Sequence, residues 1–386
     1  MIASQLDPRR WLRQRLSRSH KNDALNAAPV TDCRVSEWTS MSTGSAHALE
    51  HALDLESVFK SEVVDLGSLQ GSAFAGIVTP HAELSAAKEG VDSVFLENAE
   101  DYYAKYQGFD YWKMLIEQAT KRISIASPTL IVEFGCGFGN STLPLLELFP
   151  GAQVIATDIS PNLLLILNRL VTARGQRTRC IAAAMDAQKP YLRDGIADLV
   201  VGSAILHHLA EPDIFVRRAM DVLKPGGAAI FFEPFEAGNA LLRLICLEIE
   251  AEANRRKVKN NRAIKWLHAI PEQLAPQIFR ARHRGWRELN DKWAFPKSVL
   301  ERIARENGAD LLIYPIHDNQ KQFTRHFGYM METYAGILKS ELPDWAWKIF
   351  DRFDNEIFSP EMLTDLLLEG CVIFQKPQNA LLTPSD

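Results

Sequence analysis

The stretch from Ile131 to Asn140 reads Ile-Val-Glu-Phe-Gly-Cys-Gly-Phe-Gly-Asn, and it decides the fold. A short apolar run ends in a loop with three glycines, and a helical pattern then runs from Asn140 to Phe149. Glycine lets a backbone turn tightly and approach a ligand without a Cβ clash. The free N–H groups of a helix N-terminus favour a carboxylate or phosphate. The stretch is therefore typical of a ligand-binding strand–loop–helix junction.

The glycine spacing differs from the dinucleotide fingerprint. Counted from Gly135, the third glycine of Gly-x-Gly-x-x-Gly would fall at position 140, which is Asn140. This difference weighs against a nicotinamide-dependent oxidoreductase, the main enzymatic alternative. Glu133 lies two residues before the first glycine, where a carboxylate can hold an ammonium group through charge-assisted hydrogen bonds.

Short apolar runs alternate with helical patterns on both sides of this junction. The expected strands cover 129–134, 153–157, 177–183, 198–202 and 228–233, and the expected helices cover 140–149, 161–174 and 212–223. Such alternation favours right-handed crossovers and a parallel sheet covered on both faces. Two later runs, at 311–316 and 371–375, predict a sixth and a seventh strand.

Acidic residues follow the second and third strands. Asp158, in Ala-Thr-Asp-Ile-Ser-Pro, can accept hydrogen bonds from a ribose diol. The alternative role, a helix N-cap, suits Ser160 better because it directly precedes Pro161. Asp186 can receive an adenine amino group, or it can be an ordinary solvated loop residue.

The segment from Ala197 reads Ala-Asp-Leu-Val-Val-Gly-Ser-Ala-Ile-Leu-His-His-Leu, and Leu-Lys-Pro-Gly-Gly and Ile-Phe-Phe-Glu-Pro follow by Pro234. In this order the motifs resemble the class I S-adenosylmethionine-dependent methyltransferase superfamily over residues 129–234. The resemblance implies a Rossmann-like α/β fold with a seven-stranded, mostly parallel sheet and helices on both faces. It also implies that the seventh strand runs antiparallel between the fifth and sixth. An N-terminal helical cap and helical insertions after strands five and six complete the expected fold.

The resemblance also implies S-adenosylmethionine as cofactor and assigns its binding residues. Glu133 and the glycine loop would hold the methionine end, Asp158 the ribose and Asp186 the adenine. The expected cofactor-binding set is Tyr103, Glu133, Gly135, Cys136, Gly137, Gly139, Asp158, Ile159, Met185, Asp186 and Ser203.

Three residues at the ends of the fourth and fifth strands are candidates for the catalytic side. His207 and His208 follow the fourth strand and Glu233 ends the fifth, at the edge where open α/β sheets bind ligands. A histidine there can act as general base; packing residues are the alternative. The chain lacks the Asn/Asp-Pro-Pro-Tyr-type loop that the resembled family uses on nitrogens of nucleic acids and proteins, so the resemblance implies a small-molecule acceptor. No metal site is expected.

Composition narrows the remaining possibilities. The 386 residues carry a formal net charge of −5, which argues against nucleic-acid binding. The five cysteines are odd in number and scattered, which favours a reducing cytoplasm. No apolar run reaches the length of a membrane span. Residues 241–297 hold thirteen basic and six acidic side chains, so this segment carries +7 and the rest −12. A basic lid of this kind can recruit an acidic or carrier-bound acceptor; a solvated face or a partner surface is the alternative.

We therefore expect five regions: a disordered tail at 1–45, a helical cap at 46–128, the cofactor-binding core at 129–235, a basic helical insertion at 236–295, and the C-terminal part of the core at 296–386 with a helical insertion at 319–368. Association of chains through the insertions is left open. A methyltransferase-like subunit that only binds a partner is the non-enzymatic alternative, and an aminopropyl-transferring relative would share the fold.

Overall fold

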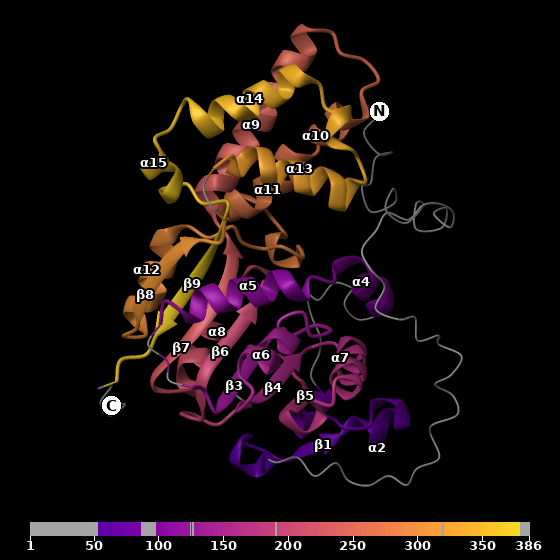
Figure 1. Ribbon diagram of the computed structural model, residues 1–386, viewed down its shortest axis with the longest axis vertical. Coiled ribbons are helices and arrows are strands. Elements are labelled where there is room, and N and C mark those ends of the chain that lie inside the picture. Colours follow the sequence, from indigo (N-terminus) through magenta and orange to yellow (C-terminus); the bar gives the residue numbers. More distant parts are fainter. Residues whose placement is uncertain are drawn as a thin grey trace. The chain divides into compact units, whose positions relative to one another are not determined.

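The computed structural model describes residues 53–85, 98–123, 125, 127–189, 191–317 and 320–378 (Figure 1). The predicted disordered tail at 1–45 lies outside the described residues. The strands are β1 Val63–Asp65, β2 Ile77–Pro80, β3 Leu130–Phe134, β4 Gln153–Asp158, β5 Cys180–Ala184, β6 Ala197–Ser203, β7 Leu223–Pro234, β8 Asp310–Pro315 and β9 Glu369–Gln375. They form one sheet in the order β1-β2-β5-β4-β3-β6-β7-β9-β8.

The order of the sheet confirms the predicted α/β architecture. Strands β5, β4, β3, β6 and β7 are parallel neighbours. Strand β9 runs antiparallel between β7 and β8, as expected for the last two strands. Strands β3 to β7 could be predicted from the sequence because each is an apolar run between helical segments.

The sheet has nine strands, so the prediction of seven was too low. Strands β1 and β2 lie in the segment that was expected to be wholly helical. Apolar residues of 46–70 recur at helical spacing in the sequence, but Ile77 and Val78 further along are β-branched, buried and paired in parallel with Ala182 and Ala183 of β5. This pairing covers the edge that β5 would otherwise expose.

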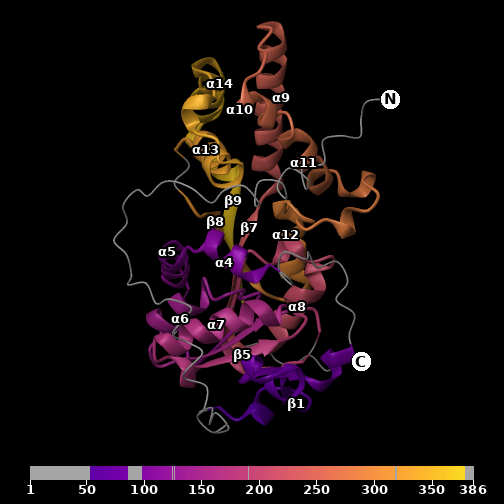
Figure 2. The ribbon, with the colours of Figure 1, turned by 90° about the vertical axis from the view of Figure 1, so that its right-hand side faces the viewer.

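The helices cover both faces of the sheet. Their bounds are α2 Leu66–Gln70, α4 Ala99–Tyr106, α5 Phe109–Thr120, α6 Thr142–Leu148, α7 Pro161–Ala173, α8 Pro212–Val222, α9 Glu236–Arg255, α10 Arg262–Leu267, α11 Ile270–Ile278, α12 Lys297–Glu306, α13 Gln322–Ala335, α14 Asp344–Asn355 and α15 Pro360–Asp365. Short 3₁₀ turns are η2 Leu55–Ser57, η3 Ser72–Phe74, η4 His81–Ser85, η5 Arg177–Arg179, η6 Leu206–His208, η7 Arg280–Arg282, η8 Trp286–Glu288 and η9 Lys339–Glu341. Figure 2 shows α5 and α12 on opposite sides of the strands.

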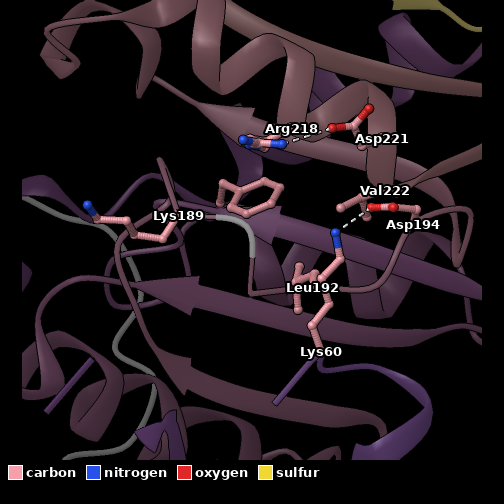
Figure 3. A pocket seen from close by; sticks show the side chains of 8 residues that line it. Lys60, Lys189, Leu192, Asp194, Arg218, Asp221 and Val222 are labelled. Atoms are coloured by element: carbon pink, nitrogen blue, oxygen red, sulfur yellow. Dashed lines mark hydrogen bonds and ion pairs between the residues drawn. The ribbon is translucent and has the colours of Figure 1, made fainter. Parts of the chain in front are cut away.

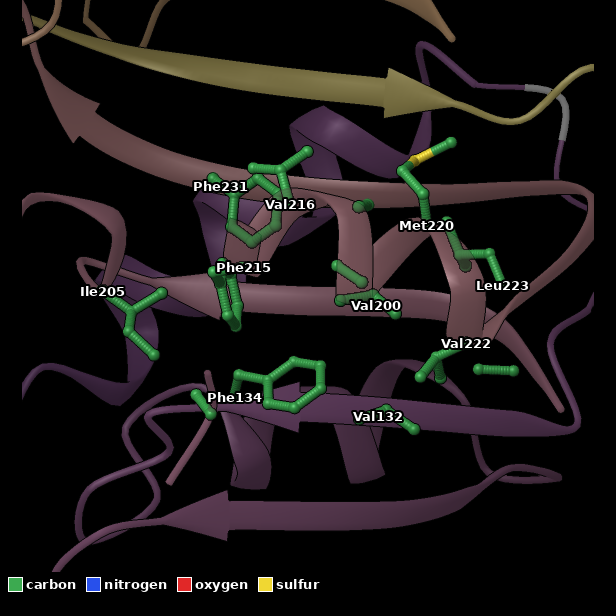
Figure 4. Close-up of a cluster of buried hydrophobic side chains, with 14 of the residues drawn as sticks. Val132, Phe134, Val200, Ile205, Phe215, Val216, Met220, Val222, Leu223 and Phe231 are labelled. Atoms are coloured by element: carbon green, nitrogen blue, oxygen red, sulfur yellow. The ribbon is translucent and has the colours of Figure 1, made fainter. Parts of the chain in front are cut away.

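Alternate residues of the central strands build a core on each face. On β3, Val132 and Phe134 pack with Phe215 of α8, whereas Ile131 packs with Leu115 of α5 on the other face. Figure 4 shows the first of these clusters. The alternation follows from the two-residue period of a strand. The central strands are therefore buried on both sides, which holds their carboxyl ends in fixed relative positions.

The insertions after β7 and β8 share a third core. Ile245 of α9, Phe327 of α13 and Phe350 of α14 are fully buried in it. Among the described residues, no helix combines the length and apolar character that crossing a membrane requires.

Candidate functional site

The glycine loop after β3 follows a path that side chains would obstruct. Gly135, Gly137 and Gly139 all have positive φ, at 66°, 55° and 100°. A Cβ on Gly139 would lie 2.6 Å from Leu167 Cδ1, and one on Gly135 would lie 2.8 Å from Ile205 Cδ1. The loop is therefore packed between α7 and the segment after β6, so the glycines are needed for the loop itself to form.

Glu133 ties the end of β3 to the start of α6. Its carboxylate is fully buried and accepts hydrogen bonds from the Ser141 hydroxyl and, at 2.5 Å, from Thr142 Oγ1. Burial raises the pKa of Glu133 to about 7, against the two hydroxyl hydrogen bonds, and the charge of Asp158 raises it further. Both carboxylate oxygens thus already have partners within the chain, and the predicted contact with an ammonium group stays a prediction.

Asp158 at the end of β4 lies against the glycine loop. Its Oδ2 accepts from the Gly137 N–H at 2.8 Å, and its Oδ1 accepts from the Ser160 N–H at 2.8 Å. The Cys136 N–H also donates to the Thr157 carbonyl at 2.9 Å. The Ser160 side chain accepts from Leu163 and caps α7. The loop and the second acid of the predicted site are therefore in direct contact.

The residues after β5 lie next to Asp158, at the same edge of the sheet. The Met185 N–H donates to the Asp158 carbonyl at 2.9 Å, and Asp186 Oδ1 accepts from the Gln188 N–H at 2.9 Å. Ile159 directly follows β4 and Met185 directly follows the adjacent strand β5, with Asp186 next in the chain. On the other side of β3, the Ser203 hydroxyl at the end of β6 is buried without a hydrogen-bond partner among the described residues. A buried polar atom of this kind is a place where a ligand or water completes the bonding.

The predicted cap contacts the loop through aromatic rings. Tyr102 and Tyr103 of α4 pack edge-on against Phe138, with ring centroids 5.8 and 5.1 Å apart. Asn140 adds two hydrogen bonds: its Oδ1 accepts from the Gly108 N–H at 2.9 Å, and its Nδ2 donates to the Tyr106 carbonyl at 2.8 Å. The sequence argument used Asn140 only to exclude the dinucleotide fingerprint and missed this contact.

Glu233, near the end of β7, forms hydrogen bonds with the segment after β6 on the other side of the candidate site. Its buried carboxylate accepts from the backbone N–H groups of residues 205, 206 and 207, at 3.1, 2.8 and 3.2 Å. It also lies 2.6 Å from His207 Nδ1. Burial alone would lower the pKa of His207, but the charge and hydrogen bond of Glu233 outweigh burial and raise it. Two of the three predicted catalytic residues, His207 and Glu233, are therefore one hydrogen-bonded unit.

A residue that sequence reasoning missed completes this cluster. Asp291 Oδ1 lies 3.7 Å from His207 Nε2 and 3.4 Å from His208 Nδ1. The segment is docked by the Lys292 and Trp293 N–H groups, which donate to the His207 carbonyl at 2.7 and 3.2 Å. Burial, followed by the positive charge of His207, lowers the pKa of His208 to about 4. The charge excess of the insertion was the only sequence signal there, and it does not single out Asp291.

Many basic side chains of the insertion face acids. Arg255 and Arg256 pair with Glu252, and Arg280 lies 3.6 Å from Glu236. Further pairs join Arg262 to Glu341 and Lys297 to Asp365. The excess of positive charge counted in the sequence of this segment is thus partly balanced by ion pairs in the structure. Recruitment of an acidic acceptor by this segment stays a prediction.

Two hollows lie away from the predicted site residues. One, of about 10 Å³, lies beside the Lys60–Asp194 ion pair and Phe134, and could hold about one water (Figure 3). The other, of about 340 Å³, lies between α8 and the segment with Trp286 and Trp293. Neither is lined by a predicted site residue.

Residues 132–229 match the family model described as "Methyltransferase domain". A trans-aconitate 2-methyltransferase of Methylobacterium radiotolerans is 33% identical over 106 residues, which cover 28% of this chain and 38% of that protein. A demethylmenaquinone methyltransferase of Thermus thermophilus is 32% identical over 107 residues, covering 28% of this chain and 48% of that protein. The chain thus spans less than half the length of these curated relatives.

Among solved structures, phosphoethanolamine N-methyltransferase 2 of Haemonchus contortus with S-adenosyl-L-methionine is 15% identical, with a TM-score of 0.40. That match covers 69% of this chain and 53% of the other.

Proposed function

We propose that the chain, whose residues 132–229 match a methyltransferase domain, is a class I S-adenosylmethionine-dependent methyltransferase that transfers a methyl group from S-adenosylmethionine to a small molecule. One observation carries this proposal. The glycine loop, Asp158 and the residues after β5 are joined by direct hydrogen bonds, Gly137 N–H to Asp158 and Met185 N–H to the Asp158 carbonyl. The three parts of the expected cofactor site therefore form one continuous edge.

The residues at this edge fit the cofactor. Asp158 would hold the ribose hydroxyls and Asp186 the adenine amino group, while the loop from Gly135 to Gly139 approaches the methionine end. The orphaned Ser203 hydroxyl offers a further hydrogen bond. When bound, the cofactor supplies an activated sulfonium methyl group. The chain would then mainly position the acceptor in line with this group and exclude water.

The acceptor would meet the chain at His207. In its neutral form, His207 would donate its Nδ1 proton to Glu233 and carry the lone pair on Nε2. That lone pair can either take the proton of the acceptor or bind a cation that acidifies it. Relatives named for trans-aconitate and demethylmenaquinone support an acceptor that is a small molecule.

We also propose that the protein works in the cytoplasm. Four cysteines in the described part of the chain, Cys136, Cys180, Cys246 and Cys371, are free and buried. Buried thiols in this state are compatible with a reducing compartment, where disulfides are rare.

Calorimetric titration with S-adenosylmethionine and S-adenosylhomocysteine tests the proposal. We expect micromolar binding that Asp158→Ala weakens at least tenfold, or about 1.4 kcal/mol. Asp310→Ala is the matched control, because Asp310 is an exposed carboxylate at the opposite end of the sheet. NAD should not bind. A folded wild-type chain that binds neither cofactor form would overturn the proposal, and so would equal effects of the two variants.

A further inference from the structure

We propose that His207, His208 and Asp291 bind a divalent transition-metal ion of the zinc type on the acceptor side of the site. One ligand atom from each residue lies within 4.8 Å of the others. Asp291 Oδ1 is 3.7 Å from His207 Nε2 and 3.4 Å from His208 Nδ1. Binding of the ion does not depend on the proposed methyl transfer; only its use does.

The spacing agrees with tetrahedral coordination. Nitrogen and oxygen ligands about 2.0–2.2 Å from Zn²⁺ lie roughly 3.3–3.6 Å from each other at tetrahedral angles. The His208–Asp291 separation already falls in this range, and the His207–Asp291 separation is only slightly above it. Asp291 is the most exposed of the three side chains and so the most free to adjust, and the three ligand atoms lie within 4.8 Å of one another.

The orientation of His207 is the second argument. A metal-binding histidine usually donates its other ring N–H to a carboxylate, which fixes the tautomer and makes the ligand nitrogen more basic. Glu233 does this for His207 at 2.6 Å. Three backbone N–H groups hold the Glu233 carboxylate in place, so His207 Nδ1 is fixed on Glu233 while Nε2 lies 3.7 Å from Asp291 Oδ1.

Two neighbouring contacts bear on the site. His208 Nδ1 lies 3.0 Å from the Asn290 carbonyl, a contact that the ion would replace. The Lys292 ammonium, whose positive charge acts on His208, donates to the Leu289 carbonyl at 2.7 Å. With three protein ligands, the ion would have a fourth position for water or substrate, as in catalytic zinc sites.

The open position deepens the proposed function by favouring an acceptor with a hydroxyl group. The ion would lower the pKa of that hydroxyl, whose proton leaves to solvent. The acceptor oxygen would then form the new O–C bond while the S–C bond breaks, and the electron pair of the S–C bond would stay on sulfur. The cofactor becomes the neutral thioether, so charge and atoms balance.

The test uses the full chain without a histidine tag, treated with a chelator and dialysed. Zn²⁺ is titrated calorimetrically, and Co²⁺ is added to detect the visible absorption of tetrahedral cobalt. We expect about one ion per chain, and His208→Ala and Asp291→Asn should each weaken binding at least about tenfold. His283→Ala is the matched control, because His283 is an exposed histidine of the same insertion.

Binding of S-adenosylmethionine is measured on the same samples. Cofactor binding without stoichiometric metal binding would overturn the metal site and leave the proposed function intact. Metal binding that His208→Ala and Asp291→Asn do not change would also overturn it, since the ion would then lie elsewhere. Metal binding without cofactor binding would support the site and overturn the proposed function.

Discussion

The cofactor side and the acceptor side of the candidate site are held together in different ways. On the cofactor side, Asp158 accepts a hydrogen bond from Gly137, 21 residues away; Asp158 ends β4, and Gly137 follows the neighbouring parallel strand β3. On the acceptor side, His207 contacts Asp291, which comes from an insertion with its own helices. The cofactor side thus follows from the sheet, whereas the acceptor side depends on how an insertion docks on it.

The largest expected effect is that of a variant on the acceptor side, which tests whether turnover can be lost without loss of cofactor binding. Glu233→Gln replaces the acceptor of the His207 Nδ1 proton with an amide that presents N–H groups to backbone donors. We expect turnover to fall on the order of 1,000-fold, whereas the affinity for S-adenosylmethionine changes little. Steady-state kinetics and calorimetry on one sample give both numbers.

Glu211→Gln is the control, because Glu211 is exposed and lies close to η6, the 3₁₀ turn that contains His207. It should change neither turnover nor the affinity for S-adenosylmethionine. An equal loss of cofactor affinity in Glu233→Gln would break the distinction between the two sides.

The next effect concerns the cofactor side alone and appears as a dependence of stability on pH. The pKa of Glu133 is raised from 4.5 to about 7 in the folded chain, so the folded state binds more protons between these values. The free energy of unfolding should therefore fall by roughly 3 kcal/mol as the pH rises from about 4.5 to 7. Glu133→Gln should remove this slope. Denaturant unfolding at several pH values measures it, and parallel curves for both proteins would contradict the assignment.

The smallest effect concerns an ion pair between the cap and α7. Arg169 and Glu100 are 2.7 Å apart, with half or more of each side chain exposed. Such pairs contribute little, so Arg169→Ala should lower stability by at most about 0.5 kcal/mol. A thermal melt checks this value. A larger loss would mean that surface charge, and not the Phe138 ring contacts and Asn140 hydrogen bonds, holds the cap in place.

The difference between the two sides also sets what the sequence could predict. The positions of Glu133 and Asp158 could be predicted because each ends an apolar run whose pairing fixes it. The sequence likewise places Glu233 near the end of β7 and His207 in the turn after the neighbouring strand β6. Asp291 could not be found, because its place depends on the packing of residues 280–296 and no periodic pattern encodes that. Strands β1 and β2 were missed because three or four residues are too few for alternation to stand out against a helical background.

Asn140 has a consequence for the energetics of the whole cofactor side. It lies at the end of the glycine loop and holds the turn between α4 and α5 through two hydrogen bonds. A ligand that restricts the loop must therefore also restrict the cap, and a closed cap must favour the ligand by the same factor. The amide protons of α4 should accordingly exchange more slowly with solvent when the cofactor is bound, because opening of the helix then competes with the binding free energy. The loop and the cap thus share a single thermodynamic linkage.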